Sequence, residues 1–126
     1  MFKKILAATD MITVCDAPVL TAAQLAEQNN AKLHILHVLE SASAENRHVI
    51  KHFRTGKDII TSAEYEGTVK EQINKTYSEV LKPSVNYEIR VTTGFPCEEI
   101  LRWSREVRTD LIVIGPHSTR AEEKGV

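Results

Sequence analysis

The sequence lacks the features that mark a disulfide scaffold, a membrane protein or a nucleic-acid-binding protein. Its 126 residues include two cysteines, Cys15 and Cys97, which lie far apart and form no CxxC motif. Two such cysteines favour free thiols in a reduced, cytoplasmic compartment. The formal net charge is -1, so no global basic field favours binding to nucleic acid or to an anionic membrane. No apolar run reaches the length of a membrane span.

The amino terminus also lacks a complete signal peptide. Two lysines precede a short apolar run, but Asp10 ends that run too early for the apolar core of a signal sequence. With 42% apolar and 26% charged residues, the composition is typical of a globular domain with its own core. There is no internal repeat and no low-complexity segment. We therefore expect one domain over residues 1–126.

The rest of the chain is organised around an aliphatic run near its carboxyl end, Leu111–Ile114. Its length and its boundaries, an aspartate and a glycine, predict a short strand that is buried on both faces, as in a parallel sheet. Gly115 permits a sharp turn or the close approach of another group. The next three residues then lie at the carboxyl edge, where open α/β sheets bind ligands. They are Pro116, His117 and Ser118.

Three other segments have the residue pattern of strands. Ile5–Thr9 and Leu33–Leu39 are apolar runs, which is typical of buried parallel strands. Val85–Val91 alternates apolar and polar residues, which suits an edge strand. Because helices are expected between the strands, the pattern predicts an α/β domain with a parallel sheet. We expect the strand order 3-2-1-4, with the first and fourth strands adjacent at the centre.

Helical patterns fill most of the connections. Three helices are expected, over residues 16–28, from the capping box at 61–64 to Pro83, and from Gly94 to about Val107. The segment Glu40–Thr61 is the least regular part of the chain, and it is long for a connection. We expect it to contain a short basic helix over Asn46–Arg54 and to exchange its amide hydrogens faster than the strands.

No pattern of catalytic or metal-binding residues emerges. His48 and His52 are four apart, but no glutamate follows His48 as a metalloprotease motif requires, and no third ligand is near in sequence. His34 and His37 point to opposite faces of a strand. No Ser/His/Asp order or paired carboxylates are found. We therefore expect neither a metal site nor an enzymatic activity.

Several short motifs are spread over nearly the whole chain. They are KILAATD at 4–10, LA at 25–26, AKL at 31–33, LHV at 36–38, GFP at 94–96 and DLIVIGPHS at 110–118. No single motif is specific, but the combination resembles the universal stress protein family. The resemblance implies a flavodoxin-like, Rossmann-like sheet in the order 3-2-1-4-5, and it implies a homodimer. It also implies a role in the stress response.

The resemblance further implies a candidate nucleotide site, because some members of the family bind ATP. In those members the phosphates lie on a loop of the form G-x-x-G, then nine residues, then G-[ST]. Gly115 fills the first position, Ser118 replaces the second glycine, and no G-[ST] pair follows. By position, the candidate residues are Thr9 and Asp10 near the ribose and phosphates, Val38 beside the adenine, Gly115, Pro116, His117 and Ser118 in the loop, and Arg120 as a nearby basic residue.

Two functions follow from these observations. The first is a regulatory protein of the stress response that binds no nucleotide and acts through homodimerisation and a protein partner. The second is a module that binds ATP or AMP, which would require the rest of the glycine loop. One loop glycine of three favours the first function. We also expect that the chain is truncated at its carboxyl end, without the family's last helix and fifth strand. A chain that ends in this way should self-associate through Leu111–Ile114 and bind ATP weakly or not at all.

Overall fold

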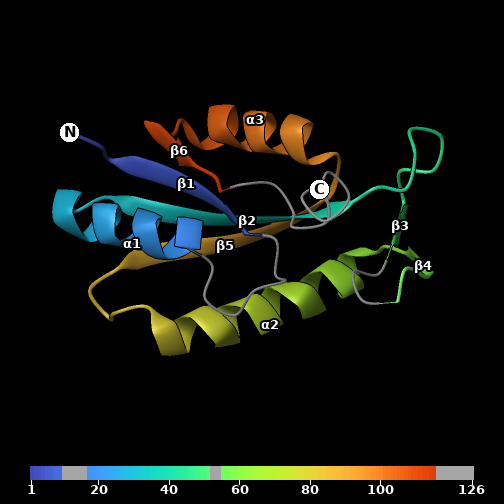
Figure 1. The fold of residues 1–126 in the computed structure, drawn as a ribbon, viewed down its shortest axis with the longest axis horizontal. Coiled ribbons are helices and arrows are strands. Elements are labelled where there is room, and N and C mark those ends of the chain that lie inside the picture. The colour runs from blue at the N-terminus through green and yellow to red at the C-terminus, as the bar shows by residue number, and fades with distance from the viewer. Residues whose placement is uncertain (10–16, 52–54, 116–126) are drawn as a thin grey trace, which may run out of the picture.

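A four-stranded parallel sheet forms the centre of the molecule (Figure 1). The computed structural model describes residues 1–9, 17–51 and 55–115. The strands are β1 (Lys4–Thr9), β2 (Lys32–Glu40), β5 (Asn86–Gly94) and β6 (Leu111–Val113). They lie in the order β5-β2-β1-β6, and every pairing is parallel. Counted along the chain, these four parallel strands have the order 3-2-1-4, so the predicted topology is confirmed.

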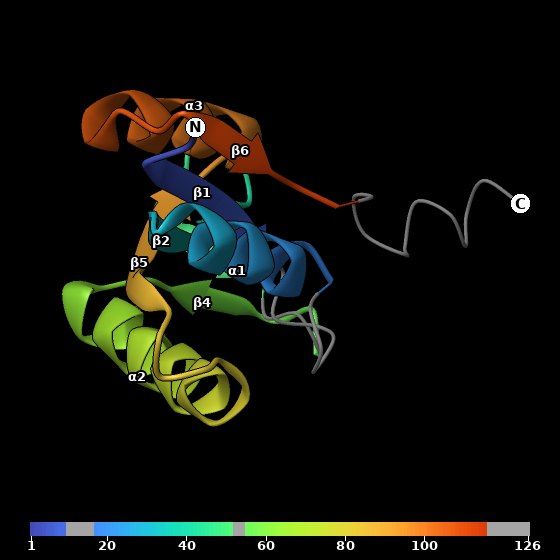
Figure 2. The same ribbon diagram turned by 90° about the vertical axis from the view of Figure 1, so that its left-hand side faces the viewer.

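Helices cover both faces of this sheet. Figure 2 shows α1 (Ala17–Asn29) and α2 (Ala63–Val80) on one face and α3 (Pro96–Val107) on the other. Alternate residues of β1 and β2 point towards α1 and α2, and Ile5 and Ile35 are fully buried there. The hydrophobic core lies mainly on this face. Leu6 and Leu36, equally buried, point to the face that α3 covers.

The end of α1 and the start of α2 each carry a cap, and the cap of α2 lies in the predicted capping box. Asn30, with φ of 53°, takes the left-handed conformation directly after α1, which asparagine tolerates. The hydroxyl of Ser62 accepts a hydrogen bond from the Tyr65 amide at 3.1 Å and so caps α2. Within α1 the buried residues are mostly alanines, which let the helix lie close to the sheet.

The α3 face is more polar than the opposite face. Glu99 is the only residue of α3 in the buried class, whereas Ile100, Trp103 and Val107 are half-buried. The side of the helix that carries these three residues therefore faces the sheet but stays partly open to solvent. The guanidinium of Arg90, on β5, lies 4.4 Å from the ring centre of Trp103.

The predicted short basic helix over Asn46–Arg54 is wrong. The segment contains β3 (Val49–Lys51), which pairs with β4 (Asp58–Ile60) as an antiparallel hairpin. The β-branched residues Val49, Ile50, Ile59 and Ile60 explain the difference, because they favour strands over helices. Ile50 is 2% exposed and also pairs with Ser41, which attaches the hairpin to the end of β2.

The prediction that Leu111–Ile114 is a strand buried on both faces is also wrong. The strand ends at Val113, its three residues are half-buried, and Ile114 is 61% exposed. The reason is its position, because β6 is an edge strand of the described sheet and pairs with β1 alone. None of the helices in the described ranges is long and apolar enough to cross a membrane.

Candidate functional site

The candidate site lies where β1 and β6 end side by side. From β1 the chain passes through α1 to β2 on one side, whereas the connection from β5 through α3 leads to β6 on the other side. The direction of winding therefore reverses between β1 and β6. In open α/β sheets, this reversal marks the crevice in which ligands bind. The structure thus puts the ends of the first and fourth parallel strands next to each other, as predicted.

Thr9, the last residue of β1, is held by two other elements. Its hydroxyl lies 3.2 Å from the hydroxyl of Tyr77 on α2, and both side chains are buried. Its carbonyl oxygen accepts a hydrogen bond from Nδ1 of His37 at 2.8 Å. Since a carbonyl can only accept, this bond fixes the proton on Nδ1 of the His37 ring. The side chain of Thr9 therefore points towards α2 rather than along the strand axis.

Val38 lies on the neighbouring strand, one position beyond the residue that pairs with Thr9. It is half-buried on the α3 face of β2 and pairs with Thr92 of β5. Its side chain and that of Thr9 thus point to opposite faces of the sheet. The family resemblance places the backbone of Val38 beside the adenine. The direction of the Val38 side chain therefore does not bear on that role.

Gly115 packs directly against the start of α1. A Cβ atom added to it would lie 2.5 Å from Cγ of Pro18, which is closer than real contacts allow. The expected close approach at this glycine is therefore present, and the approaching group is a proline side chain. This contact brings the end of β6 to the first turn of α1, where backbone amides favour anions. The other five candidate residues, Asp10, Pro116, His117, Ser118 and Arg120, lie outside the described residues.

Sequence reasoning missed the polar cluster around Glu99. The Glu99 carboxylate, in a residue that is 7% exposed, accepts hydrogen bonds from Thr92 at 2.8 Å and from Arg102 at 2.6 Å. Gly94 makes room for it, because a Cβ there would lie 2.9 Å from Cγ of Glu99. Burial alone would raise the pKa of Glu99, but the bonds from Arg102 and Thr92, with the charges of Arg102 and Arg47, lower it below the ordinary value.

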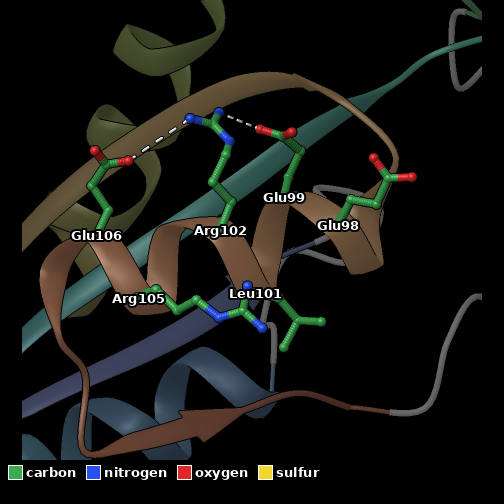
Figure 3. A pocket seen from close by; sticks show the side chains of 6 residues that line it. All are labelled: Glu98, Glu99, Leu101, Arg102, Arg105 and Glu106. Atoms are coloured by element: carbon green, nitrogen blue, oxygen red, sulfur yellow. Dashed lines mark hydrogen bonds and ion pairs between the residues drawn. The ribbon is translucent and has the colours of Figure 1, made fainter.

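A shallow hollow of about 640 Å³ lies over this part of α3 (Figure 3). Figure 3 shows the Arg102 side chain between two carboxylates. Its guanidinium lies 2.6 Å from the Glu99 carboxylate and 3.8 Å from that of Glu106. Within the helix Arg102 pairs with Glu99 and Glu106, and Glu98 pairs with Arg47 from outside it. Four of the five charged residues that line the hollow are thus in ion pairs, which favours a structural role over ligand recognition. The only signal in the sequence was the spacing of Glu99, Arg102 and Glu106 on one helix face.

The described residues include one thiol and no cluster of potential metal ligands. Among the residues that the structure describes, no three His, Cys, Asp or Glu side chains gather as a metal site would require. Cys97 is a free, exposed thiol in the first turn of α3. Cys15 lies outside the described residues, so its predicted free state stays a prediction.

The comparisons with known proteins agree with this architecture. The model of the universal stress protein family matches residues 1–125. The chain belongs to this family. No curated protein matches its sequence. The family assignment therefore confirms the resemblance found in the short sequence motifs.

Solved structures of other universal stress proteins share the fold. One from Archaeoglobus fulgidus is 20% identical, with a TM-score of 0.61, over 93% of this chain and 78% of that chain. One from the universal stress protein family of Burkholderia pseudomallei is 18% identical, with a TM-score of 0.64, over 95% and 86%. A universal stress protein in complex with cAMP is 21% identical, with a TM-score of 0.59, over 92% and 74%. At these identities the likeness concerns the fold alone.

Proposed function

We propose that this universal stress protein is a cytoplasmic regulatory protein of the stress response that acts through homodimerisation and a protein partner, and that it is not an enzyme. The proposal rests on the exposure of β6 at the edge of the described sheet. This edge strand pairs with β1 alone among the described strands, its three residues are half-buried, and Ile114 is 61% exposed. An edge strand with unpaired backbone groups and apolar side chains favours association with another chain.

The proposal predicts a self-association that depends on β6. Sedimentation velocity at micromolar concentration should find a dimer for the wild-type chain. Ile114→Lys should shift it to the monomer, because the charge would be buried at the contact. Ile60→Lys is the matched control, since Ile60 is 77% exposed on β4, outside the four-stranded sheet. A monomeric wild-type chain, or a dimer that Ile114→Lys leaves intact, would contradict the use of this edge.

The second candidate is a module that binds ATP or AMP. It is favoured by the reversal of winding between β1 and β6 and by the contact of Gly115 with Pro18 at the start of α1. The cAMP complex of a protein with the same fold also supports it. Its candidate residues remain Thr9, Asp10, Val38, Gly115, Pro116, His117, Ser118 and Arg120. No metal is required from the protein itself in this proposal.

Calorimetry with Mg-ATP, AMP and cAMP separates the two candidates. Because Ser118 stands where the loop has its second glycine, we expect weakened binding. Each lost phosphate contact is worth about 1.5–3 kcal/mol, so each one weakens binding by about one to two powers of ten. Micromolar affinity for a nucleotide that Asp10→Ala abolishes and Asp58→Ala preserves would favour the second candidate. Asp58 serves as the control because it is an exposed carboxylate on the β3–β4 hairpin.

A further inference from the structure

His34 is a titratable side chain enclosed between the sheet and α3. It lies on the α3 face of β2, where it pairs in register with Leu6 of β1 on one side and Glu88 of β5 on the other. The residue is 4% exposed, and its Nδ1 atom is buried without a hydrogen-bond partner among the described residues. The site therefore suits the neutral ring, in which one nitrogen carries no proton.

The charges around His34 offer no free partner for a second proton on its ring. Glu88 is the one carboxylate among those that act on His34, and it already pairs with Lys32 at 2.9 Å and with Arg90 at 3.2 Å. The other charges that act on the ring are the cations of Lys4, Lys32 and Arg90. Burial lowers the pKa of His34 below the ordinary 6.5, and Glu88 alone opposes that shift. A proton on His34 would thus add a fourth cation beside one carboxylate.

The charged groups of the other elements packed on this face are engaged elsewhere. Asp110, which leads into β6, accepts hydrogen bonds from the backbone amides of Lys3 and Lys4 at 2.7 and 2.9 Å. On α3, Arg102 and Glu106 pair with each other at 3.8 Å. Neither element therefore supplies a free carboxylate to a protonated His34.

The helix that covers His34 is the least deeply seated of the three. Helices α1 and α2 each have three or more apolar or aromatic residues in the buried class, whereas the buried residue of α3 is Glu99. The apolar side of α3 stays half-buried against the sheet. Few buried apolar contacts favour local opening, so α3 is the part of this face that can move at the smallest cost.

The direction of α3 brings its last turn to the level of His34. Near its start the helix is bound to Thr92 of β5, and one turn later the ring of Trp103 lies 4.4 Å from the guanidinium of Arg90. The helix therefore runs antiparallel to β5. The turn that follows Trp103 reaches the level of His34, two residues further back along the sheet from Arg90 and its neighbour on β2.

We propose that His34 is a proton-operated switch, and that its protonation releases residues 103–107 of α3 from the sheet. When this part of the helix moves away, the His34 ring regains water and its ordinary affinity for protons. The equilibrium then shifts towards the open form as the pH falls below 6.5, by at most tenfold per pH unit for one proton. The shift ends once the pH is below the lower pKa of His34 in the closed form.

Glu88 and Arg90 connect the switch to the helix. In the closed form Arg90 contacts the Glu88 carboxylate on β5 at 3.2 Å and the Trp103 ring on α3 at 4.4 Å. A protonated His34 competes with Arg90 for that carboxylate, because it lies beside Glu88 in the sheet. A displacement of Arg90 then weakens its contact with Trp103, which is one of the contacts that hold α3.

The release uncovers an apolar part of the sheet. Leu6, the neighbour of His34 on β1, is fully buried in the closed form. The inference goes beyond the proposed function, because it concerns the face under α3 and depends neither on the β6 edge nor on a nucleotide. A monomeric chain that binds no nucleotide would leave it intact.

Hydrogen exchange between pH 7.5 and 5.5, corrected for the intrinsic rate of each amide, tests the switch. Protection at 103–107 should be lower than at 33–39 throughout, which separates local opening from global unfolding. It should fall as the pH drops below 6.5, by up to tenfold per pH unit. His34→Gln cannot gain a charge and should remove this dependence. His48→Gln, at an exposed histidine, is the matched control and should keep it.

The indole N–H of Trp103 gives a second readout that needs no variant. Its nitrogen is buried, and Trp103 is the one tryptophan in the sequence, so its signal in a proton–nitrogen correlation spectrum is unambiguous. Its exchange with water, relative to that of free tryptophan, should accelerate over the same pH range. Protection at 103–107 that equals that at 33–39, a corrected exchange that ignores pH in either readout, or a pH dependence that persists in His34→Gln would each overturn the proposal.

Discussion

The hydroxyl of Tyr77 lies 3.2 Å from the hydroxyl of Thr9, and both side chains are buried. This contact joins the carboxyl end of β1 to the last turn of α2, across 68 residues of sequence. Thr9 was assigned to the candidate nucleotide site by its position alone. In the structure the Thr9 side chain contacts Tyr77 and so helps to hold α2 against the sheet.

Tyr77→Phe should therefore destabilise the fold. The change keeps the ring in the core and removes the hydroxyl that Thr9 contacts, so the free energy of unfolding should fall by about 1 kcal/mol. Urea denaturation followed by circular dichroism measures it. Tyr65→Phe is the control, because Tyr65 is half-buried on the same helix and its hydroxyl has no such buried contact with Thr9. Equal losses in the two variants would contradict a specific role for this bond.

Glu99 should make stability depend on pH in the acid range. Although burial opposes it, the bonds from Arg102 and Thr92 hold the pKa of Glu99 below its ordinary value of 4.5. A lowered pKa means that the stabilising contribution is complete above pH 4.5 and is lost as the pH falls through the lower, folded-state pKa.

Replacement of Glu99 by glutamine measures that contribution. Glu99→Gln should lower the unfolding free energy at pH 7 by about 1–2 kcal/mol, since a charge-assisted bond to a partly exposed arginine becomes a neutral one. In acid below the lowered pKa of Glu99 the wild-type carboxylate is protonated, so the gap between the two proteins should narrow there. Glu106→Gln, at the more distant end of the same arginine, should show a small difference under both conditions.

Protonation of His34 should destabilise the folded state, whereas protonation of a salt-bridged histidine stabilises it. His34 is buried on the α3 face of β2, and its Nδ1 has no hydrogen-bond partner among the described residues. Burial lowers the pKa of His34 below the ordinary 6.5, against the charge of Glu88 and with the help of Lys32, Arg90 and Lys4. The unfolded chain then binds the proton more readily than the folded chain.

Stability should thus be complete above pH 6.5 and should fall as the pH drops towards the lower pKa of folded His34. The slope cannot exceed about 1.4 kcal/mol per pH unit for one proton. Urea midpoints between pH 7.5 and 5.5 should show this slope for the wild type and a smaller one for His34→Leu. His48→Gln, at an exposed histidine, should keep the wild-type slope.

The β3–β4 hairpin should exchange its amide hydrogens faster than the central sheet. It has three residues in each strand, and an isolated pair of strands is marginally stable. Ile50 is buried in the core and Ile59 packs partly against it, whereas Ile60 is 77% exposed. Hydrogen exchange followed by mass spectrometry should find faster exchange at 49–51 and 58–60 than at 33–39. Protection equal to that of β2 would contradict this.

The strand order was predictable because it follows from local patterns and a general rule. Ile5–Thr9 and Leu33–Leu39 are apolar runs, the segments between strands have helical spacing, and such units wind in one direction. The alternation in Val85–Val91 correctly marked an edge strand. The predicted burial of Leu111–Ile114 was wrong because an apolar composition shows only that a strand favours burial. Whether its side chains are buried depends on the elements that pack against it.

The hairpin and the Glu99 cluster could not be predicted for different reasons. Val49 and Ile50 have the spacing of either a short helix or a short strand, and pairing with Ile59 and Ile60 decides between them. In the sequence Glu99 is an ordinary acidic residue in the first turn of α3, where the helix dipole favours acids. Its bond to Thr92 depends on the angle at which α3 crosses β5, which no local pattern encodes.

The pairing of β1 with β6 has a consequence for synthesis on the ribosome. Ile5 pairs with both Leu33 and Leu111, so one neighbour of β1 is made early and the other late. Strands β1, β2 and β5 can assemble with α1 and α2 before the last part of the chain has been translated. Until α3 and β6 arrive, Leu6 and Leu36, which are fully buried in the finished protein, face solvent. At this stage the nascent chain thus exposes an apolar face of the sheet. Such a face is one that a ribosome-associated chaperone would bind.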